Sequence, residues 1–247
     1  MQVKGVLFDL GGTLFSYARR GGMGRAIFEA ASGLGIDAPP EDIGRAWGSA
    51  SKSVMAGYAA RDYFLHRDLF HDTLSTFAGS FDKPVDADLA ERFHAAQRQS
   101  VIDHLPLRDD CHETLEALKA RGLYLSIVSN IDDDYLDPLV AKHDLHRWLD
   151  HWTSSEEAES CKPHHGIYHY SLRKAALGVD DTLFVGDSLH HDVAGASAVG
   201  MRSARIVEEG ITTPLTAGLE VTAEPDFEIT ALTDLLDIVD RLNAGAG

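Results

Sequence analysis

One stretch near the start of the chain decides the fold: Val3-Lys4-Gly5-Val6-Leu7-Phe8-Asp9-Leu10-Gly11-Gly12-Thr13-Leu14. It opens with a short apolar run that ends at a carboxylate and a pair of glycines. An apolar run of this length, closed by a glycine turn, is typical of a buried strand rather than of a helix. We therefore predict a first strand over Val3–Phe8, with Asp9 at its carboxyl end.

The second half of the chain alternates such runs with helical segments. A helix after Leu105-Pro106 is predicted to begin with a capping box of Asp110 and Glu113 and to end at Gly122. The further strands are expected over Leu123–Ser129, Trp148–Ser154, Leu183–Gly186, Arg202–Val207 and Phe227–Ile229. The further helices are expected over about Asp132–His143, Gly166–Leu177, a segment after Asp187 that ends at Gly200, and Leu232–Leu242. This alternation predicts an α/β fold, a parallel sheet with helices on both faces.

Residues from about Ser16 to Ser100 differ in kind, because they are rich in alanine and carry aromatic residues at loosely helical spacing. We expect a block of several helices, with these aromatic residues in its core. The shifts in composition predict an α/β domain of residues 1–15 and 101–247, into which a helical domain of about 16–100 is inserted. Arg19 and Arg20 fall at the first junction, where they fit a solvated hinge or a contact with an anion.

Composition and charge exclude several classes of function. The 247 residues, 44% hydrophobic and 25% charged, are typical of an ordinary globular protein. A formal net charge of −17 would repel a phosphate backbone or an anionic membrane, so we expect neither nucleic acid nor membrane as a partner. Cys111 and Cys161 lack the spacing of a disulfide framework or of a thiolate zinc site. We find no signal-peptide core and no apolar stretch of roughly 18 residues, and expect a cytoplasmic location.

Polar side chains follow the predicted strands at or just past their carboxyl ends. They are Asp9, the pair Ser129-Asn130, Lys162 before Pro163, and Asp187 with Asp192. In a parallel α/β sheet these ends converge on one crevice, which is where ligands bind. Asp9 and Asp187 would repel each other there unless a hard cation lay between them, and oxygen ligands with open water positions suit Mg²⁺.

The same crevice holds groups that suit a phosphate. Lys162 would add a fixed positive charge, and the backbone N–H groups of the Gly11-Gly12-Thr13 turn would donate hydrogen bonds, together with the hydroxyls of Thr13 and Ser129. A carboxylate nucleophile, Mg²⁺, a lysine and hydroxyl groups together indicate phosphoryl transfer through an aspartyl-phosphate. The expected substrate is a small phosphorylated metabolite.

At these residues the sequence resembles the haloacid dehalogenase (HAD) superfamily. Its four ordered motifs are similar to Phe8-Asp9-Leu10-Gly11-Gly12-Thr13-Leu14, Val128-Ser129-Asn130, Lys162-Pro163, and Gly186-Asp187-Ser188 with Asp192. The helical block lies where members with a helical cap of the first type insert theirs. The resemblance therefore implies a Rossmann-like core, an α-helical cap that closes over the site, and a phosphatase.

The resemblance also implies a role for each motif residue. Asp9 would be the nucleophile, Thr13 and Ser129, with Asn130 beside it, would bind the transferred phosphoryl group, and Lys162 would neutralise its charge. Asp9, Asp187 and the main-chain carbonyl of Gly11 would bind Mg²⁺. Asp192 would orient Lys162 or the water shell of the metal.

Gly11 departs from the pattern, because most phosphatases of the superfamily have there a second Asp that serves as general acid and base. Such a group is typically worth about 10²–10⁴-fold in rate. His190, near the predicted crevice, is one candidate to replace it. Two other functions stay open: a metal-independent 2-haloacid dehalogenase, in which Asp9 attacks carbon, and a catalytically weak protein that binds phosphate without turnover.

Overall fold

The computed structural model describes residues 2–17, 24–59, 61–210 and 222–245. They form two compact units, Met1–Arg19 with Pro106–Gly247, and Arg20–Leu105. The proposed hinge residues Arg19 and Arg20 lie outside the described residues. Among the residues described, no helix is both long enough and apolar enough to cross a membrane.

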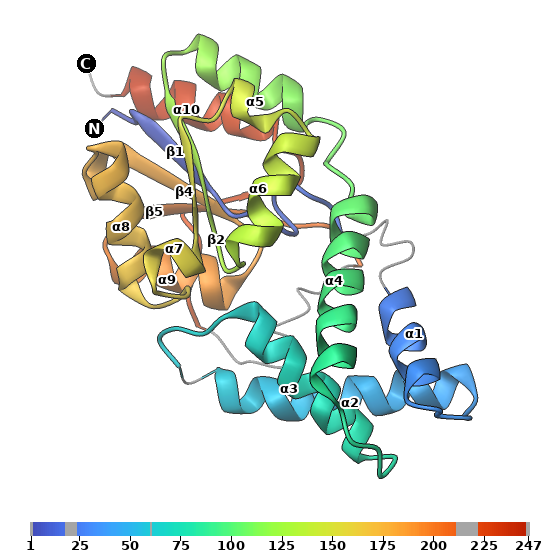
Figure 1. Ribbon diagram of the computed structural model, residues 1–247. Coiled ribbons are helices and arrows are strands. Elements are labelled where there is room, and N and C mark those ends of the chain that lie inside the picture. Colours follow the sequence, from blue (N-terminus) through green and yellow to red (C-terminus); the bar gives the residue numbers. More distant parts are fainter. Residues whose placement is uncertain (1, 18–23, 60, 211–221, 246–247) are drawn as a thin grey trace. The chain divides into compact units, whose positions relative to one another are not determined.

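The first unit is built on a parallel sheet, as the alternating pattern predicts (Figure 1). The described strands lie in the order β3-β2-β1-β4-β5-β6. Their bounds are β1 Gly5–Phe8, β2 Tyr124–Ser129, β3 His151–Ser154, β4 Thr182–Gly186, β5 Arg202–Ile206 and β6 Phe227–Ile229. Strand β1, in the centre, is buried along its whole length, which is typical of a parallel strand covered on both faces.

Helices cover both faces of this sheet. Figure 1 shows α5 and α10 together on one face, and α8 and α9 on the other. The helix bounds are α5 Cys111–Ala120, α6 Asp133–Lys142, α7 Ser155–Ala158, α8 His165–Ala175, α9 Ala194–Ala198 and α10 Asp234–Ala244. Short 3₁₀ turns lie at η1, Leu145–Arg147, and η2, Val179–Asp181, and a π-helical turn lies at η3, Leu189–Val193. The core between the sheet and α8 includes Leu7, Phe184 and Tyr168.

The strand register sets where the polar side chains lie. Phe8 pairs with Ile127 of β2 on one side and with Val185 of β4 on the other. Strand β1 therefore ends two residues before the end of β2 and one residue before the end of β4. Because the chain leaves β1 for β2 on one side and later enters β4 on the other, this end of the sheet is a topological switch point, where ligands bind in such folds.

The second unit contains only helices among its described residues: α1 Arg25–Gly33, α2 Pro40–Tyr58, α3 His66–Gly79 and α4 Ala87–His104. The aromatic core expected here is present in part, since Trp47 packs edge-on against Phe77 and also contacts Phe93. Phe28 is the exception, with 44% of its surface exposed.

Three local predictions were wrong. The Asp110 side chain makes no capping hydrogen bond to α5; its Oδ2 instead accepts from the backbone N–H groups of Leu232 and Thr233, at 2.7 and 3.3 Å. The regular helix expected after Asp187 begins as the π-helical turn η3, and only Ala194–Ala198 is α-helical. The strand expected from Trp148 begins at His151, because the backbone N–H groups of Trp148 and Leu149 donate to the Leu145 carbonyl in a turn, at 3.0 and 3.1 Å.

Candidate active site

Asp9 lies at the centre of the site, directly after β1. Its backbone N–H donates to the Val185 carbonyl of β4 at 2.8 Å, which continues the ladder by one residue. Two hydroxyls donate to its carboxylate: Thr13 Oγ1 to Oδ2 and Ser129 Oγ to Oδ1, both at 3.3 Å. The three side chains predicted from two separate motifs therefore lie together, and all are buried.

Lys162 is buried between two carboxylates. Its Nζ donates to Asp9 Oδ1 at 2.5 Å and to Asp192 Oδ1 at 2.7 Å, and only 2% of its side chain is exposed. Burial alone lowers the pKa of Lys162, but the charges of Asp192 and Asp9 outweigh it, and the pKa lies above its ordinary value. Lys162 is therefore a fixed cation at neutral pH.

Asn130, at the end of β2, contacts the backbone of Lys162 rather than its side chain. The Asn130 Nδ2 donates to the Lys162 carbonyl at 2.8 Å, and the Asn130 Oδ1 accepts from the Lys162 N–H at 2.6 Å. Both polar atoms of this side chain therefore hold the segment that carries the lysine.

Asp192 is fixed by two donors. Its Oδ1 accepts from Lys162, and its Oδ2 accepts from the Ser188 N–H at 2.9 Å. The turn η3 carries it into the interior, where only 1% of the residue is exposed. Gly186 leaves the space, since a Cβ there would come within 2.3 Å of the Asp192 side chain.

Asp187 approaches the loop that follows Asp9. Gly12 has a φ of +85°, and a Cβ at this position would lie 2.3 Å from Asp187 Oδ2. Position 12 therefore requires glycine for two reasons: its positive φ, and the close approach of the Asp187 carboxylate. Arg205 Nε donates to the main-chain carbonyl of Asp187 at 3.2 Å and so helps to position the backbone of this residue.

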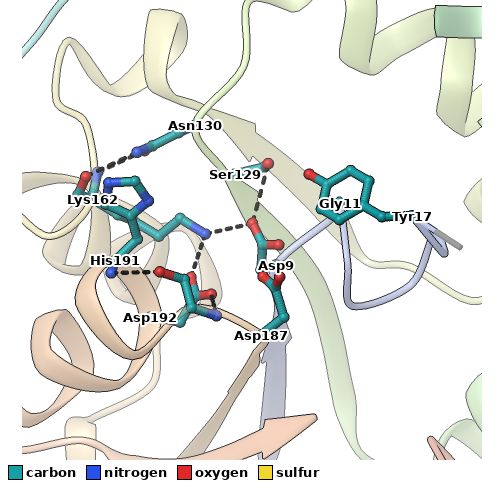
Figure 2. Close-up of a pocket in the computed structure, with 10 residues that line it drawn as sticks. Asp9, Gly11, Tyr17, Ser129, Asn130, Lys162, Asp187, His191 and Asp192 are labelled. Atoms are coloured by element: carbon teal, nitrogen blue, oxygen red, sulfur yellow. Dashed lines mark hydrogen bonds and ion pairs between the residues drawn. The ribbon is translucent and has the colours of Figure 1, made fainter. Parts of the chain in front are cut away.

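These side chains surround a cavity of about 60 Å³, which Figure 2 shows with its lining residues. Since about 10–15 Å³ is enough for one water molecule, the cavity has room for a reacting group and a few water molecules. Its lining residues are Asp9, Gly11, Tyr17, Ser129, Asn130, Lys162, Asp187, Ser188, His191 and Asp192. All belong to the α/β unit.

The donor set of the cavity fits a divalent cation. Asp9, Asp187 and Asp192 each offer a carboxylate oxygen, and these atoms lie within 4.8 Å of one another. Burial raises the pKa of the Asp9 carboxyl; Lys162 opposes this, and the charge of Asp192 adds to it. One lysine thus leaves part of the carboxylate charge uncompensated, and such oxygen clusters bind hard cations.

Two lining residues were not predicted from the sequence. His191 lines the cavity, whereas His190, the candidate proton donor, is absent from the described lining residues. The π-helical turn η3 begins after Ser188, whose Oγ accepts from the His191 N–H. A π-helical turn has more residues per turn than the regular helix that the sequence suggests, so its side chains point in different directions from those of an α-helix. Tyr17 also lines the cavity, and no local motif indicates it.

The chain is similar in sequence to known proteins over most of its length. A family model for haloacid dehalogenase-like hydrolases matches residues 3–200. The chain is 28% identical over 242 residues to a ribulose-1,5-bisphosphate 5-phosphatase of Halopiger xanaduensis, covering 95% of this chain and 98% of the relative. It is 26% identical over 249 residues to a glyceraldehyde 3-phosphate phosphatase of Methanocaldococcus jannaschii, covering 97% and 98%.

Solved structures share the fold. A putative HAD-hydrolase of Bacillus subtilis, YfnB, bound to magnesium, has a TM-score of 0.75 at 16% identity, with 97% of this chain and 100% of that chain covered. The L-2-haloacid dehalogenase of Xanthobacter autotrophicus has a TM-score of 0.70 at 25% identity, with 97% and 99% covered. The family model spans four-fifths of the chain, and the motif residues meet at one switch point; the chain therefore belongs to the haloacid dehalogenase-like hydrolases.

Proposed function

We propose that this enzyme hydrolyses small phosphomonoesters with Mg²⁺ as cofactor, through a phosphoryl group carried on Asp9. One observation carries the proposal: the Asp9 carboxylate is held by Lys162, Thr13 and Ser129 while the carboxylate of Asp187 lies close by. A nucleophile, a fixed cation, two hydroxyl donors and a cation site are the groups that phosphoryl transfer requires.

Each side chain has a task that follows from its contacts. Asp9 attacks phosphorus, the leaving oxygen departs with the bonding electron pair, and water later hydrolyses the acyl phosphate. Lys162 offsets the negative charge that gathers on Asp9 and the phosphoryl oxygens, and Asp192 holds its amine in place. Thr13 and Ser129 touch the two oxygens of Asp9, so they are also within reach of oxygens on a phosphorus bonded there.

The proposed metal site comprises the carboxylates of Asp9 and Asp187 and the main-chain carbonyl of Gly11. Asp192 is 1% exposed and accepts from Lys162 and from the Ser188 N–H, so we assign it the role of holding Lys162. Bound there, Mg²⁺ would supply positive charge next to the transferred phosphoryl group.

The curated relatives support this assignment, because both act on phosphate esters of small molecules according to their names. The fold is shared with a haloacid dehalogenase and does not distinguish the two activities. The neighbouring carboxylates of Asp9 and Asp187, whose oxygens lie within 4.8 Å of each other, favour the metal-dependent reaction.

The test is a panel of phosphomonoesters and 2-haloacids, assayed with Mg²⁺ and with EDTA. We expect phosphate release that disappears in EDTA and returns with excess Mg²⁺. Asp187→Asn should raise the Mg²⁺ concentration needed for half-maximal rate at least about tenfold, given how strongly ligand loss weakens metal sites. Asp181→Asn is the matched control, because it changes a carboxylate that pairs with Lys4 outside the cavity. It should change neither the rate of phosphate release nor the Mg²⁺ concentration needed for half-maximal rate.

Two outcomes would contradict the proposal. Halide release in EDTA would identify a dehalogenase instead. Binding of phosphoesters without turnover would identify a phosphate-binding protein.

A further inference from the structure

The phenol of Tyr17 occupies the space that a side chain at position 11 would fill. A Cβ built on Gly11 would lie 2.2 Å from the Tyr17 hydroxyl oxygen and 2.9 Å from Cζ. Figure 2 shows the ring beside Gly11, with its oxygen directed toward the side of the cavity where Ser129 and Asp9 lie. The Tyr17 hydroxyl therefore occupies the place that the side chain of residue 11 would take if it were not glycine.

The neighbouring glycine and the loop anchor hold the ring in this place. A Cβ at Gly12 would lie 3.0 Å from Cε2 of Tyr17, so both glycines are needed for the ring to lie against the backbone. Ser16, which precedes the tyrosine, donates its N–H to the Pro106 carbonyl at 3.0 Å and its Oγ–H to Glu208 at 2.6 Å. The backbone on which Tyr17 stands is thus fixed to the α/β unit.

The other donors around Asp9 are directed at the nucleophile itself. Thr13, Ser129 and Lys162 all donate to its carboxylate oxygens. Asp187 and Asp192 are acceptors when ionised. A phosphoester bound at Asp9 has in addition a bridging oxygen, on which negative charge develops as the P–O bond breaks. Tyr17 brings a further hydroxyl to the wall of this cavity, and Figure 2 shows it on the other side of Asp9 from the Lys162 amine.

We propose that Tyr17 donates a hydrogen bond from its hydroxyl to the leaving oxygen of the phosphoester, an inference that rests on the proposed function. In the step, a bond forms between an Asp9 oxygen and phosphorus while the bond from phosphorus to the bridging oxygen breaks. The leaving oxygen keeps the electron pair, accepts the Tyr17 hydrogen bond as it departs, and takes its proton from water. A donor placed where charge develops is worth about 10²–10³-fold in rate when water is excluded, and less in an open site.

The role predicts a dependence on the leaving group. An alkyl oxygen departs with its charge concentrated on one atom and needs the donor, whereas a p-nitrophenolate spreads the charge over its ring. Tyr17→Phe should therefore lower kcat for an alkyl phosphate such as 2-phosphoglycolate about 10–100-fold, and for p-nitrophenyl phosphate less than about threefold. A series of substituted phenyl phosphates should show a steeper dependence of kcat on leaving-group pKa in the variant than in the wild type.

A second variant, at Gly11, tests the position of the same hydroxyl. Gly11→Ala places a methyl group where the phenol lies, and since the contacted atom is the far end of the Tyr17 side chain, the ring must move. The alkyl-selective loss should recur, and the two changes combined should cost little more than either alone. Tyr170→Phe is the matched control, since its hydroxyl contacts Glu157 away from the cavity, and it should leave both rates unchanged.

The outcomes separate this inference from the one it rests on. Equal losses with both substrate classes, or an unchanged alkyl rate in Tyr17→Phe, would overturn the role of Tyr17 while leaving the phosphatase intact. A wild-type protein that hydrolyses neither class with Mg²⁺ would overturn both. The measured slope against leaving-group pKa also excludes a merely structural role, because loss of packing lowers both rates alike.

Discussion

The side-chain amide of Asn130 and the backbone of Lys162 exchange two hydrogen bonds, at 2.6 and 2.8 Å. The contact joins the end of β2 to the segment that delivers the lysine to Asp9. Asn130 can therefore affect the reaction through the position of Lys162. Asn243 makes the same pair of hydrogen bonds away from the site: its Oδ1 accepts from the Val3 N–H at 2.7 Å, and its Nδ2 donates to the Val3 carbonyl at 3.3 Å.

This repeat provides a matched pair of variants. Asn130→Ala and Asn243→Ala each leave a backbone N–H and a carbonyl without these partners, so each should lower the free energy of unfolding by about 1–3 kcal/mol in urea titrations. Only Asn130→Ala should lower kcat, by about 10²-fold, because a displacement of about 1 Å in the site is that costly. An equal loss of activity in both variants would show that the contact acts through stability alone.

Asp9→Asn tests the nucleophile. The amide keeps the size of the side chain but cannot form the covalent intermediate, so phosphate release should fall to background. The protein should still fold, because Lys162 keeps its partner Asp192, and circular dichroism checks this. Asp240→Asn, which changes a surface carboxylate paired with Arg121, serves as control. More than about a tenth of wild-type turnover in Asp9→Asn would exclude the assignment.

Glycine 12 is expected to matter for two separable reasons. Gly122 has a similar φ, +77°, but no atom within 4 Å of a Cβ built on it, whereas at Gly12 that atom would strike Asp187. Gly122→Ala should therefore cost only the left-handed backbone penalty, about 1–2 kcal/mol in unfolding free energy. Gly12→Ala should cost more and also weaken Mg²⁺ activation, since Asp187 must move. Equal Mg²⁺ dependence in the two variants would contradict the close approach.

The partly buried ring of His151 makes stability depend on pH. Its nitrogens contact Tyr124 and Ser171, and burial first, then the charge of Lys174, lower its pKa to about 4 from 6.5, against an opposing effect of Asp150. Because the unfolded chain binds the proton more readily between these values, stability should fall as the pH falls from 6.5 toward 4, and this contribution should be constant above 6.5.

The loss amounts to about 1–2 kcal/mol, which allows for the partial exposure of the ring. Urea unfolding at several pH values measures it. His151→Gln should flatten this part of the pH profile, whereas His146→Gln, a change at an exposed residue, should not. An unaltered profile in His151→Gln would assign the effect to other groups.

The sequence by itself determined the sheet and the convergence of its polar residues. Strands such as Gly5–Phe8 are apolar along their length because a parallel sheet buries both faces, so a short local pattern is enough to find them. Once they are parallel, Asp9, Ser129 and Asp187 must meet at one edge, whatever the details of the connecting helices. Nothing more than local periodicity and the topology of βα units enters this inference.

Only the tertiary structure decided the partners of individual polar groups. Asp110 binds the backbone at Leu232 rather than its own helix, Asn130 binds the backbone of Lys162, and Tyr17 fills the space at Gly11. A short polar side chain finds several acceptable donors in its own neighbourhood, and the difference among them is about 1 kcal/mol. The partner that it binds depends on which segments, distant in sequence, lie next to it in the folded protein. A local sequence pattern carries no information on such long-range contacts.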